Sequence, residues 1–281
     1  MKDSEHIRCP LCSNDETVFW SAENGYDCVR CRKCRLLYVN PRPSSETIDT
    51  AVALGNHRLI GGQILATRAR RKSGKVREAA DVLREMYADV LASGRPISWL
   101  DVGAGYGEFV NTLMCVLPAH SRIDGIEPMH HKVEAAIDAG LPVREGYLES
   151  VMDKYDVISI IDVFSHIPDF ASFLTKTRGV LQPGGELLVK TGNGADIGRR
   201  ENFPGPLNLP DHLVFGGVPQ LTRFLHDAGF DVVAIRSERV DGVIASLKNV
   251  VKRLLGKPVF LSFPYSSPAR TMWIRARLRK R

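Results

Sequence analysis

The sequence predicts an α/β fold, with a parallel sheet, helices on both of its faces and a small cysteine-rich module in front. Short apolar runs alternate with helical segments from about residue 97 onward, which is typical of a parallel sheet. A glycine-rich turn, Gly103 to Gly107, follows the first of these runs and predicts a ligand site at the end of a strand. Two Cys-x-x-Cys pairs near the start of the chain predict a metal-bound module.

The composition is that of a globular protein. A chain of 281 residues with 44% hydrophobic residues can form one large domain and a small one. No apolar run reaches the roughly 18 residues that span a bilayer. The polar first residues lack the core of a signal peptide, so we expect a cytoplasmic protein. The net charge of +6, concentrated at 68–75 and 270–281, permits nucleic acid or a membrane surface as a partner without requiring either.

The spacing of apolar residues predicts the order of the elements. Strands are expected at 97–102, 122–127, 142–145, 155–161, 185–191, 231–237 and 271–278, and helices at 107–117, 129–139, 169–181 and 218–228. A further helix is expected over 63–91, and the stretch 41–60 has the composition of a linker. Residues 243–257 have the pattern of an amphipathic basic helix, which either packs against its own domain or docks on an anionic membrane.

The two cysteine pairs, Cys9-x-x-Cys12 and Cys31-x-x-Cys34, have the spacing of a four-thiolate zinc site. Four thiolates leave no coordination position open, so we expect the zinc to be structural rather than catalytic. Cys28 also forms a Cys-x-x-Cys pair with Cys31. We favour the pair that contains Cys34 and keep Cys28 as the alternative ligand, while disulfides or free thiols are the competing interpretation.

The glycine turn has the spacing G-x-G-x-G at Gly103, Gly105 and Gly107, unlike the G-x-G-x-x-G turn of dinucleotide-binding folds. Glycine has no Cβ, so a ligand can lie directly against the backbone there. Glu127 closes the next predicted strand, where its carboxylate can hold the two hydroxyls of a ribose. These residues predict an adenosine-bearing cofactor, and a methyl donor with an amino-acid tail fits them. A tight structural loop is the competing interpretation.

Five ordered segments between residues 95 and 240 resemble class I S-adenosylmethionine-dependent methyltransferases. They are LDVGAGYG at 100–107, GIEP at 125–128, YDVI at 155–158 with DVFSHIPD at 162–169, LQPGGEL at 181–187, and DHL at 211–213 leading to AGF at 228–230. The resemblance implies a Rossmann-like seven-stranded methyltransferase sheet whose last strand is antiparallel. We interpret the cysteine module as a small N-terminal zinc-ribbon. Together with this module, the resemblance divides the chain into a zinc-binding module at 1–43, a linker and helical extension at 44–94, and a methyltransferase domain at 95–281.

The same resemblance implies S-adenosyl-L-methionine as the cofactor and indicates which residues contact it. These residues are Asp101, Gly103, Ala104, Gly105, Gly107, Glu127, Pro128, Tyr147, Leu148 and Asp162. In this arrangement the segment 146–149 lies at the adenine, and Asp162 lies between the cofactor and the acceptor.

The cysteine module, with the segment RCRKCRLLYVNPRP at 30–43, resembles that of a subgroup with a zinc ribbon, linked to sugar, glycan or natural-product pathways. Two departures from the subgroup matter. Ser165 precedes His166 where many relatives have glutamate, and the chain leaves no room for the further domain of sugar C-methyltransferases. We therefore expect methylation of a hydroxyl, or alternatively an amine, on a small-molecule acceptor.

A hydroxyl acceptor has to lose its proton, and histidine is suited to accept it near neutral pH. His212 is the favoured base because it lies in the long segment 192–217, which we interpret as an active-site cover. His166 is the second candidate, and Asp162 is expected to orient the reacting groups. Helix capping or ordinary loop hydrogen bonding is the competing interpretation for both histidines.

Two other classes of function stay open on the sequence alone. An RNA methyltransferase could also combine a zinc module with a basic chain, although this module has few aromatic side chains on which bases could stack. A non-enzymatic binding module could keep the fold without its chemistry, but it would not need an intact glycine turn and Glu127.

Overall fold

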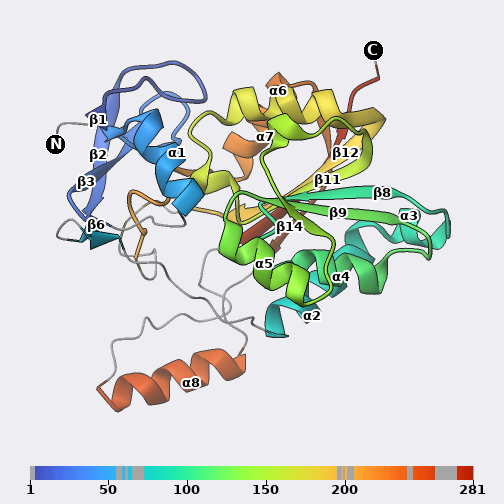
Figure 1. Cartoon of the computed structure of the whole chain (residues 1–281). Helices are drawn as coiled ribbons and strands as arrows, with labels where there is room; N and C mark the ends of the chain where they lie inside the picture. Colours follow the sequence, from blue (N-terminus) through green and yellow to red (C-terminus); the bar gives the residue numbers. More distant parts are fainter. Residues whose placement is uncertain are drawn as a thin grey trace.

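The computed structural model describes residues 4–54, 59–60, 63–64, 73–194, 198, 200, 206–238, 243–256 and 271–280. Its main body is a seven-stranded sheet between two layers of helices, and the cysteine module and α1 (Ser45–Leu54) lie beside one end of it (Figure 1). Within these residues, no helix has both the length and the apolar composition needed to cross a membrane.

The central sheet has the strand order β10-β9-β8-β11-β12-β15-β14. The strands are β8 (Ser98–Val102), β9 (Arg122–Glu127), β10 (Val143–Glu145), β11 (Tyr155–Ile161), β12 (Leu181–Gly192), β14 (Phe230–Glu238) and β15 (Thr271–Leu278). Only β15 runs antiparallel to both neighbours among these seven. The predicted α/β class, the seven strands and the antiparallel last strand are therefore confirmed.

Two layers of helices cover the sheet. On one face lie α6 (Phe170–Val180) and α7 (Val218–Asp227), whose buried Leu174 and Leu221 share a core with Ile158 and Ile274 of the sheet. On the other face lie α2 (Ser73–Met86), α4 (Glu108–Val116) and α5 (His130–Asp138), followed in Figure 1 from teal to green. A short α3 (Ala88–Ala92) follows α2. The apolar stripes of the helices thus bury both faces of the sheet.

The N-terminal module is joined to the rest of the chain by a shared sheet. Its strands are β1 (Ser4–Glu5), β2 (Thr17–Glu23), β3 (Tyr26–Cys31), β4 (Leu37–Val39) and β5 (Arg42–Pro43). A strand from far along the chain, β13 (Val214–Phe215), pairs with β4 and completes a four-stranded sheet in the order β13-β4-β3-β2. The segment 192–217 therefore ends as part of the module, which the sequence did not reveal.

Two local predictions were wrong. The stretch 41–60, expected as a linker, contains the helix α1 because Ser44 caps it: the Thr47 backbone N–H donates to Ser44 Oγ at 3.3 Å. The helix expected over 63–91 begins only at Ser73, since residues 63–64 form β7 (Gln63–Ile64), which pairs with β6 (Leu59–Ile60). Residues 65–72 of that prediction lie outside the described residues.

Candidate functional site

A pocket of about 580 Å³ lies at the carboxyl ends of β8, β9 and β11. From β8 the chain continues to β9 and β10 on one side of β8, and then crosses to β11 on its other side. The strand order therefore reverses direction at β8, and open α/β sheets bind their ligands at such a point. The volume is in the range of pockets that hold small ligands. All predicted cofactor residues except Gly107 line it, as do His166 and Asp162.

The glycine turn forms the floor of this pocket. Gly103 and Gly105 have φ values of +72° and +57°, a backbone conformation that favours glycine. A Cβ on Gly105 would meet only Glu108, at 3.9 Å, whereas a Cβ on Gly103 would lie 2.5 Å from Val163 Cγ2. Gly105 thus leaves space above bare backbone, and Gly103 allows the turn to pack against the loop after β11.

We expect Gly103→Ala to lower the free energy of unfolding by about 2 kcal/mol or more, through both the positive φ and the clash with Val163. Gly140→Ala is the matched control, because Gly140 has a φ of +73° and no atom within 4 Å of the added Cβ. Urea unfolding of both variants separates the two costs. Equal destabilisation of the two variants would contradict tight packing at Gly103.

Gly107 differs from the other predicted cofactor residues, because it does not line the pocket. It caps α4 with a φ of +79°, and an added Cβ would lie 2.5 Å from Leu141 Cδ1. Its missing side chain therefore allows α4 to pack against the segment before β10. The third glycine thus has a packing role, and its contact with a cofactor stays a prediction.

Glu127 is held by backbone at the edge of the pocket. Its carboxylate accepts hydrogen bonds from the N–H groups of Gly105 at 2.8 Å and Met129 at 3.2 Å. Lys132 Nζ lies 3.6 Å from the same carboxylate, and Glu127 is only 3% exposed. The side chain is thus fixed beside the glycine turn, in the position that the sequence assigns to a ribose-binding carboxylate.

Asp101 is a second buried carboxylate that lines the pocket. Ser159 Oγ donates to Asp101 Oδ1 at 2.6 Å and accepts the indole N–H of Trp99 at 3.0 Å. Burial, opposed by the Ser159 hydroxyl and reinforced by the charge of Glu127, raises the pKa of Asp101 to about 7. A cationic group brought into the pocket by a ligand would stabilise its ionised form.

Asp162 follows β11 with a φ of +61°, rare for a residue other than glycine. Its carboxylate lies 3.2 Å from Lys190 Nζ, and its N–H donates to the Lys190 carbonyl. Lys190 also lies 5.3 Å from the centre of the Trp273 ring, and all three residues line the pocket. Neither Lys190 nor Trp273 was singled out from the sequence, because their place at the pocket depends on strand pairing.

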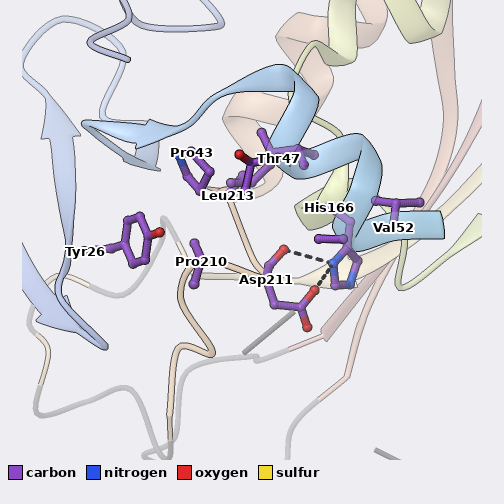
Figure 2. A pocket seen from close by; sticks show the side chains of 10 residues that line it. Tyr26, Pro43, Thr47, Val52, His166, Pro210, Asp211 and Leu213 are labelled. Atoms are coloured by element: carbon purple, nitrogen blue, oxygen red, sulfur yellow. Dashed lines mark hydrogen bonds and ion pairs between the residues drawn. The ribbon is translucent and has the colours of Figure 1, made fainter. Parts of the chain in front are cut away.

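His166 and Asp211 stand together at the wall of the pocket. Figure 2 shows the pair from the side of a smaller neighbouring cavity. His166 Nδ1 lies 2.8 Å from Asp211 Oδ1 and 3.0 Å from the Asp211 carbonyl oxygen. Both neighbours are hydrogen-bond acceptors, so Nδ1 has to carry a proton. Nε2 is then the basic nitrogen of the neutral ring.

A smaller cavity of about 50 Å³, drawn in Figure 2, adjoins the first. The two share His166, Asp211, Ile48 and Val52 as walls. The remaining walls come from three parts of the chain, namely Tyr26 and Pro43 of the N-terminal module, Thr47 and Ala51 of α1, and Pro210 and Leu213. Most of these side chains are apolar. The contribution of α1 was missed because 41–60 was interpreted as a linker.

His212, the favoured base on the sequence, lines neither cavity. Its ring packs edge-on against His166, with 4.9 Å between ring centres. Burial and the neighbouring His166 lower the pKa of His212 to about 4. His212 is therefore a neutral side chain that packs against His166 at physiological pH, and the structure brings His166 rather than His212 to the pocket wall.

The pKa of His212 predicts acid destabilisation. Unfolding restores a pKa near 6.5, so between pH 6.5 and about 4 the unfolded chain binds a proton that the native chain does not. The free energy of unfolding therefore falls as pH falls through this window, by at most about 3 kcal/mol. Denaturant unfolding should be measured across this pH range. The free energy of unfolding should depend less steeply on pH in His212→Gln than in the unchanged chain or in His226→Gln. An unchanged dependence in His212→Gln would refute this origin.

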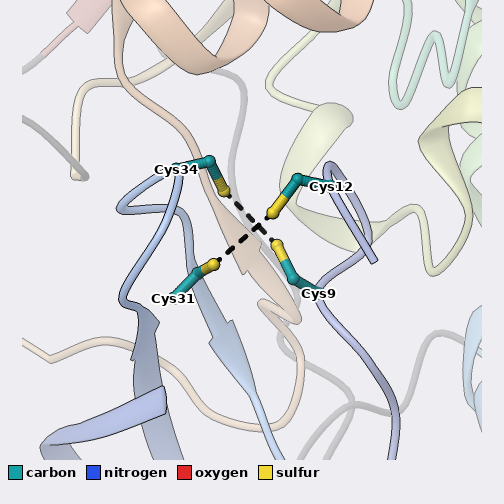
Figure 3. Close-up of side chains that lie close together, drawn as sticks. All are labelled: Cys9, Cys12, Cys31 and Cys34. Atoms are coloured by element: carbon teal, nitrogen blue, oxygen red, sulfur yellow. Dashed lines mark hydrogen bonds between the residues drawn. The ribbon is translucent and has the colours of Figure 1, made fainter. Parts of the chain in front are cut away.

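Four cysteines, Cys9, Cys12, Cys31 and Cys34, meet in the N-terminal module (Figure 3). Their sulfur atoms all lie within 4.8 Å of one another, with 3.4 Å between Cys9 and Cys34 and 3.6 Å between Cys12 and Cys31. Four thiolates around one zinc ion would be roughly 3.8 Å apart. The donor set and its spacing therefore fit a tetrahedral zinc ion.

Matching turns bring these cysteines together. The Ser13 N–H donates to the Cys9 carbonyl and the Arg35 N–H to the Cys31 carbonyl, at 2.9 and 3.0 Å, and both donors have positive φ values. Cys28 lies in a separate apolar cluster with Leu207 and Leu209. Cys31 therefore joins the cysteine cluster together with Cys34, and Cys28 does not belong to the cluster.

The fold and the pocket define a class I methyltransferase architecture. A family model described as "Methyltransferase domain" matches residues 69–235, more than half of the chain, and the chain belongs to this family. It is also 30% identical over 102 residues to a ubiquinone biosynthesis O-methyltransferase of Aeromonas salmonicida, covering 34% of this chain and 42% of that protein. The chain spans half or less of the length of the curated relatives it matches.

Two solved structures share the fold. An S-adenosylmethionine-dependent methyltransferase from Mesorhizobium loti has a TM-score of 0.51 and 17% identity, over 72% of this chain and 99% of that one. The cyclase SpnF has a TM-score of 0.52 and 17% identity, over 76% and 85%. Because one of the two is named a cyclase, the fold does not by itself define the reaction.

Proposed function

We propose that this protein is an S-adenosylmethionine-dependent methyltransferase that methylates a hydroxyl of a small-molecule acceptor. The observation that carries the proposal is the arrangement of Glu127, the glycine turn and His166 around one pocket. The matched O-methyltransferases of ubiquinone biosynthesis support a hydroxyl acceptor. The acceptor classes expected from the sequence are sugars, glycan intermediates and natural products.

The residues of the pocket fit this cofactor in charge and in shape. Gly105 offers bare backbone, Glu127 offers a fixed carboxylate for the ribose hydroxyls, and Asp101 offers a buried carboxylate for the ammonium group. Pro128, Tyr147 and Leu148 are the neighbours proposed for the adenine. When bound, the cofactor supplies an electrophilic methyl carbon on its sulfonium sulfur.

His166 is the proposed general base of the reaction. Asp211 orients its ring and keeps the proton on Nδ1, so that Nε2 can accept the proton of the acceptor hydroxyl. His212 packs against this ring, and Lys190 of β12 holds Asp162, which follows β11. Much of the remaining rate would come from holding the acceptor oxygen in line with the methyl group.

The smaller cavity supports an acceptor with an apolar substituent. It adjoins His166, and its volume of about 50 Å³ suits a group such as a methyl or methoxy substituent rather than a second ring. An acceptor that placed this group there would present a neighbouring hydroxyl to His166. This geometry favours phenolic or partly deoxygenated natural products over fully hydroxylated sugars.

The zinc proposed for the four cysteines would be structural. Its module also holds the segment that carries Asp211: the Glu23 carboxylate accepts the N–H groups of Leu207 and Asn208, both at 2.7 Å, and Asn24 Nδ2 donates to the Leu209 carbonyl. Zinc would thus stabilise the wall of the acceptor site without touching the reacting atoms.

The direct test is a transfer assay with methyl-labelled S-adenosylmethionine and a panel of phenols and sugar nucleotides. We expect label on the hydroxyl of at least one phenolic acceptor. Binding of the cofactor without transfer to any acceptor would instead support a binding module. Transfer to ribosomal RNA, with a strong salt dependence, would support the RNA alternative.

A further inference from the structure

The helix α8 (Val243–Leu254) has no role in the pocket and lies apart from the sheet and its helices (Figure 1). Four large apolar side chains near its end are mostly exposed: Leu247 at 61%, Val251 at 55%, Leu254 at 81% and Leu255 at 71%. They recur at intervals of four, three and one residues and therefore lie on one face of the helix. Exposed apolar side chains gathered in this way mark a surface that contacts something apolar.

The charge of the same helix indicates what that surface contacts. Lys248 and Lys252 are exposed beside the apolar face, and the sequence 243–256 contains no acidic residue. A protein core offers no counter-charge to Lys248 and Lys252, whereas an interface of apolar chains and anionic headgroups matches both properties of the helix. The net charge of +6 also attracts the protein to an anionic surface.

We propose that α8 docks the protein on an anionic lipid membrane, with the apolar face among the acyl chains and the lysines at the headgroups. The helix would lie in the plane of the interface, since its length of 12 residues is well below the roughly 20 needed to cross a bilayer. This proposal does not depend on the methyl-transfer reaction. It would bring the pocket close to acceptors that partition into membranes.

The test is co-sedimentation of the full chain with vesicles of phosphatidylcholine alone and with phosphatidylcholine that contains phosphatidylglycerol. We expect binding to the anionic vesicles only, weakening as salt increases. Leu254→Asp should lower the partition coefficient at least about tenfold, because a leucine side chain is no longer buried in lipid. Lys252→Glu should lower it by roughly fivefold or more.

Met152→Asp is the matched control, since Met152 is 89% exposed and lies outside α8 and the pocket. It should bind as the unchanged chain does, and circular dichroism should show that all three variants keep their fold. Absence of binding to anionic vesicles overturns the proposal, as does equal binding by Leu254→Asp. A dimer in solution that Leu254→Asp dissociates would also overturn it and would identify α8 as a contact between copies.

Discussion

Cys31→Ser is expected to release one zinc ion per chain and to produce the largest loss of stability of any substitution considered. Structural zinc sites in isolated finger peptides have apparent binding free energies of about 10–16 kcal/mol, comparable to the whole stability of a domain. Cys31 is fully buried, and the core around it includes Leu36, Tyr38 and Val214. Loss of the metal should therefore weaken the pairing of β13 with β4 and lower the temperature of unfolding.

Metal content by mass spectrometry and thermal unfolding together test this expectation. Cys115→Ser is the control, because Cys115 is exposed in α4 and far from the cluster in sequence and fold. It should retain a full zinc equivalent and the original unfolding temperature. A natural chain without zinc, or a Cys31→Ser variant with the same metal content, would show that the four cysteines do not bind this ion.

The second large effect is expected at His166. His166→Asn should lower the turnover of a hydroxyl acceptor by about 10²–10⁴-fold, the usual contribution of a general base. The affinity for S-adenosylhomocysteine should change little, because the contacts proposed for the cofactor lie at Glu127 and the glycine turn. His226→Asn is the control, since His226 is exposed on α7 and lines neither cavity.

Asp211→Asn refines this test. Because Asp211 is proposed to orient the His166 ring rather than to react, its loss should lower turnover less than loss of His166 and shift the pH profile. Full activity of His166→Asn on a hydroxyl acceptor would exclude His166 as the base. Strong loss in His212→Gln together with full activity in His166→Asn would restore the order expected from the sequence.

Local patterns were enough to predict the central sheet. The apolar runs at 98–102 and 155–161 are buried on both faces, so strand and helix alternate visibly in the sequence. Glu127 and the glycine turn could be found for the same reason, since a parallel strand places its last residues at a ligand site. The meeting of four cysteines followed from their spacing alone.

What the sequence could not reveal depends on contacts between distant segments. The pairing of β13 with β4 joins residues more than 170 positions apart, and no periodicity signals it. Which of the two histidines lines the pocket also depends on such contacts, because His166 and Asp211 stand in its wall whereas His212 does not. Gly107 was assigned to the ligand because its spacing resembles that of Gly103, although its contact is with Leu141.

Calorimetric titration of the full chain with S-adenosylhomocysteine tests most directly whether the pocket binds the proposed cofactor. We predict one site per chain, and an affinity that falls by about 1–3 kcal/mol, or roughly 5–150-fold, in Glu127→Ala. Unfolding of the variant should be measured alongside, because Glu127 also accepts the N–H of Gly105. No heat of binding in the unchanged chain, or an unchanged affinity in Glu127→Ala, would contradict the proposed pocket.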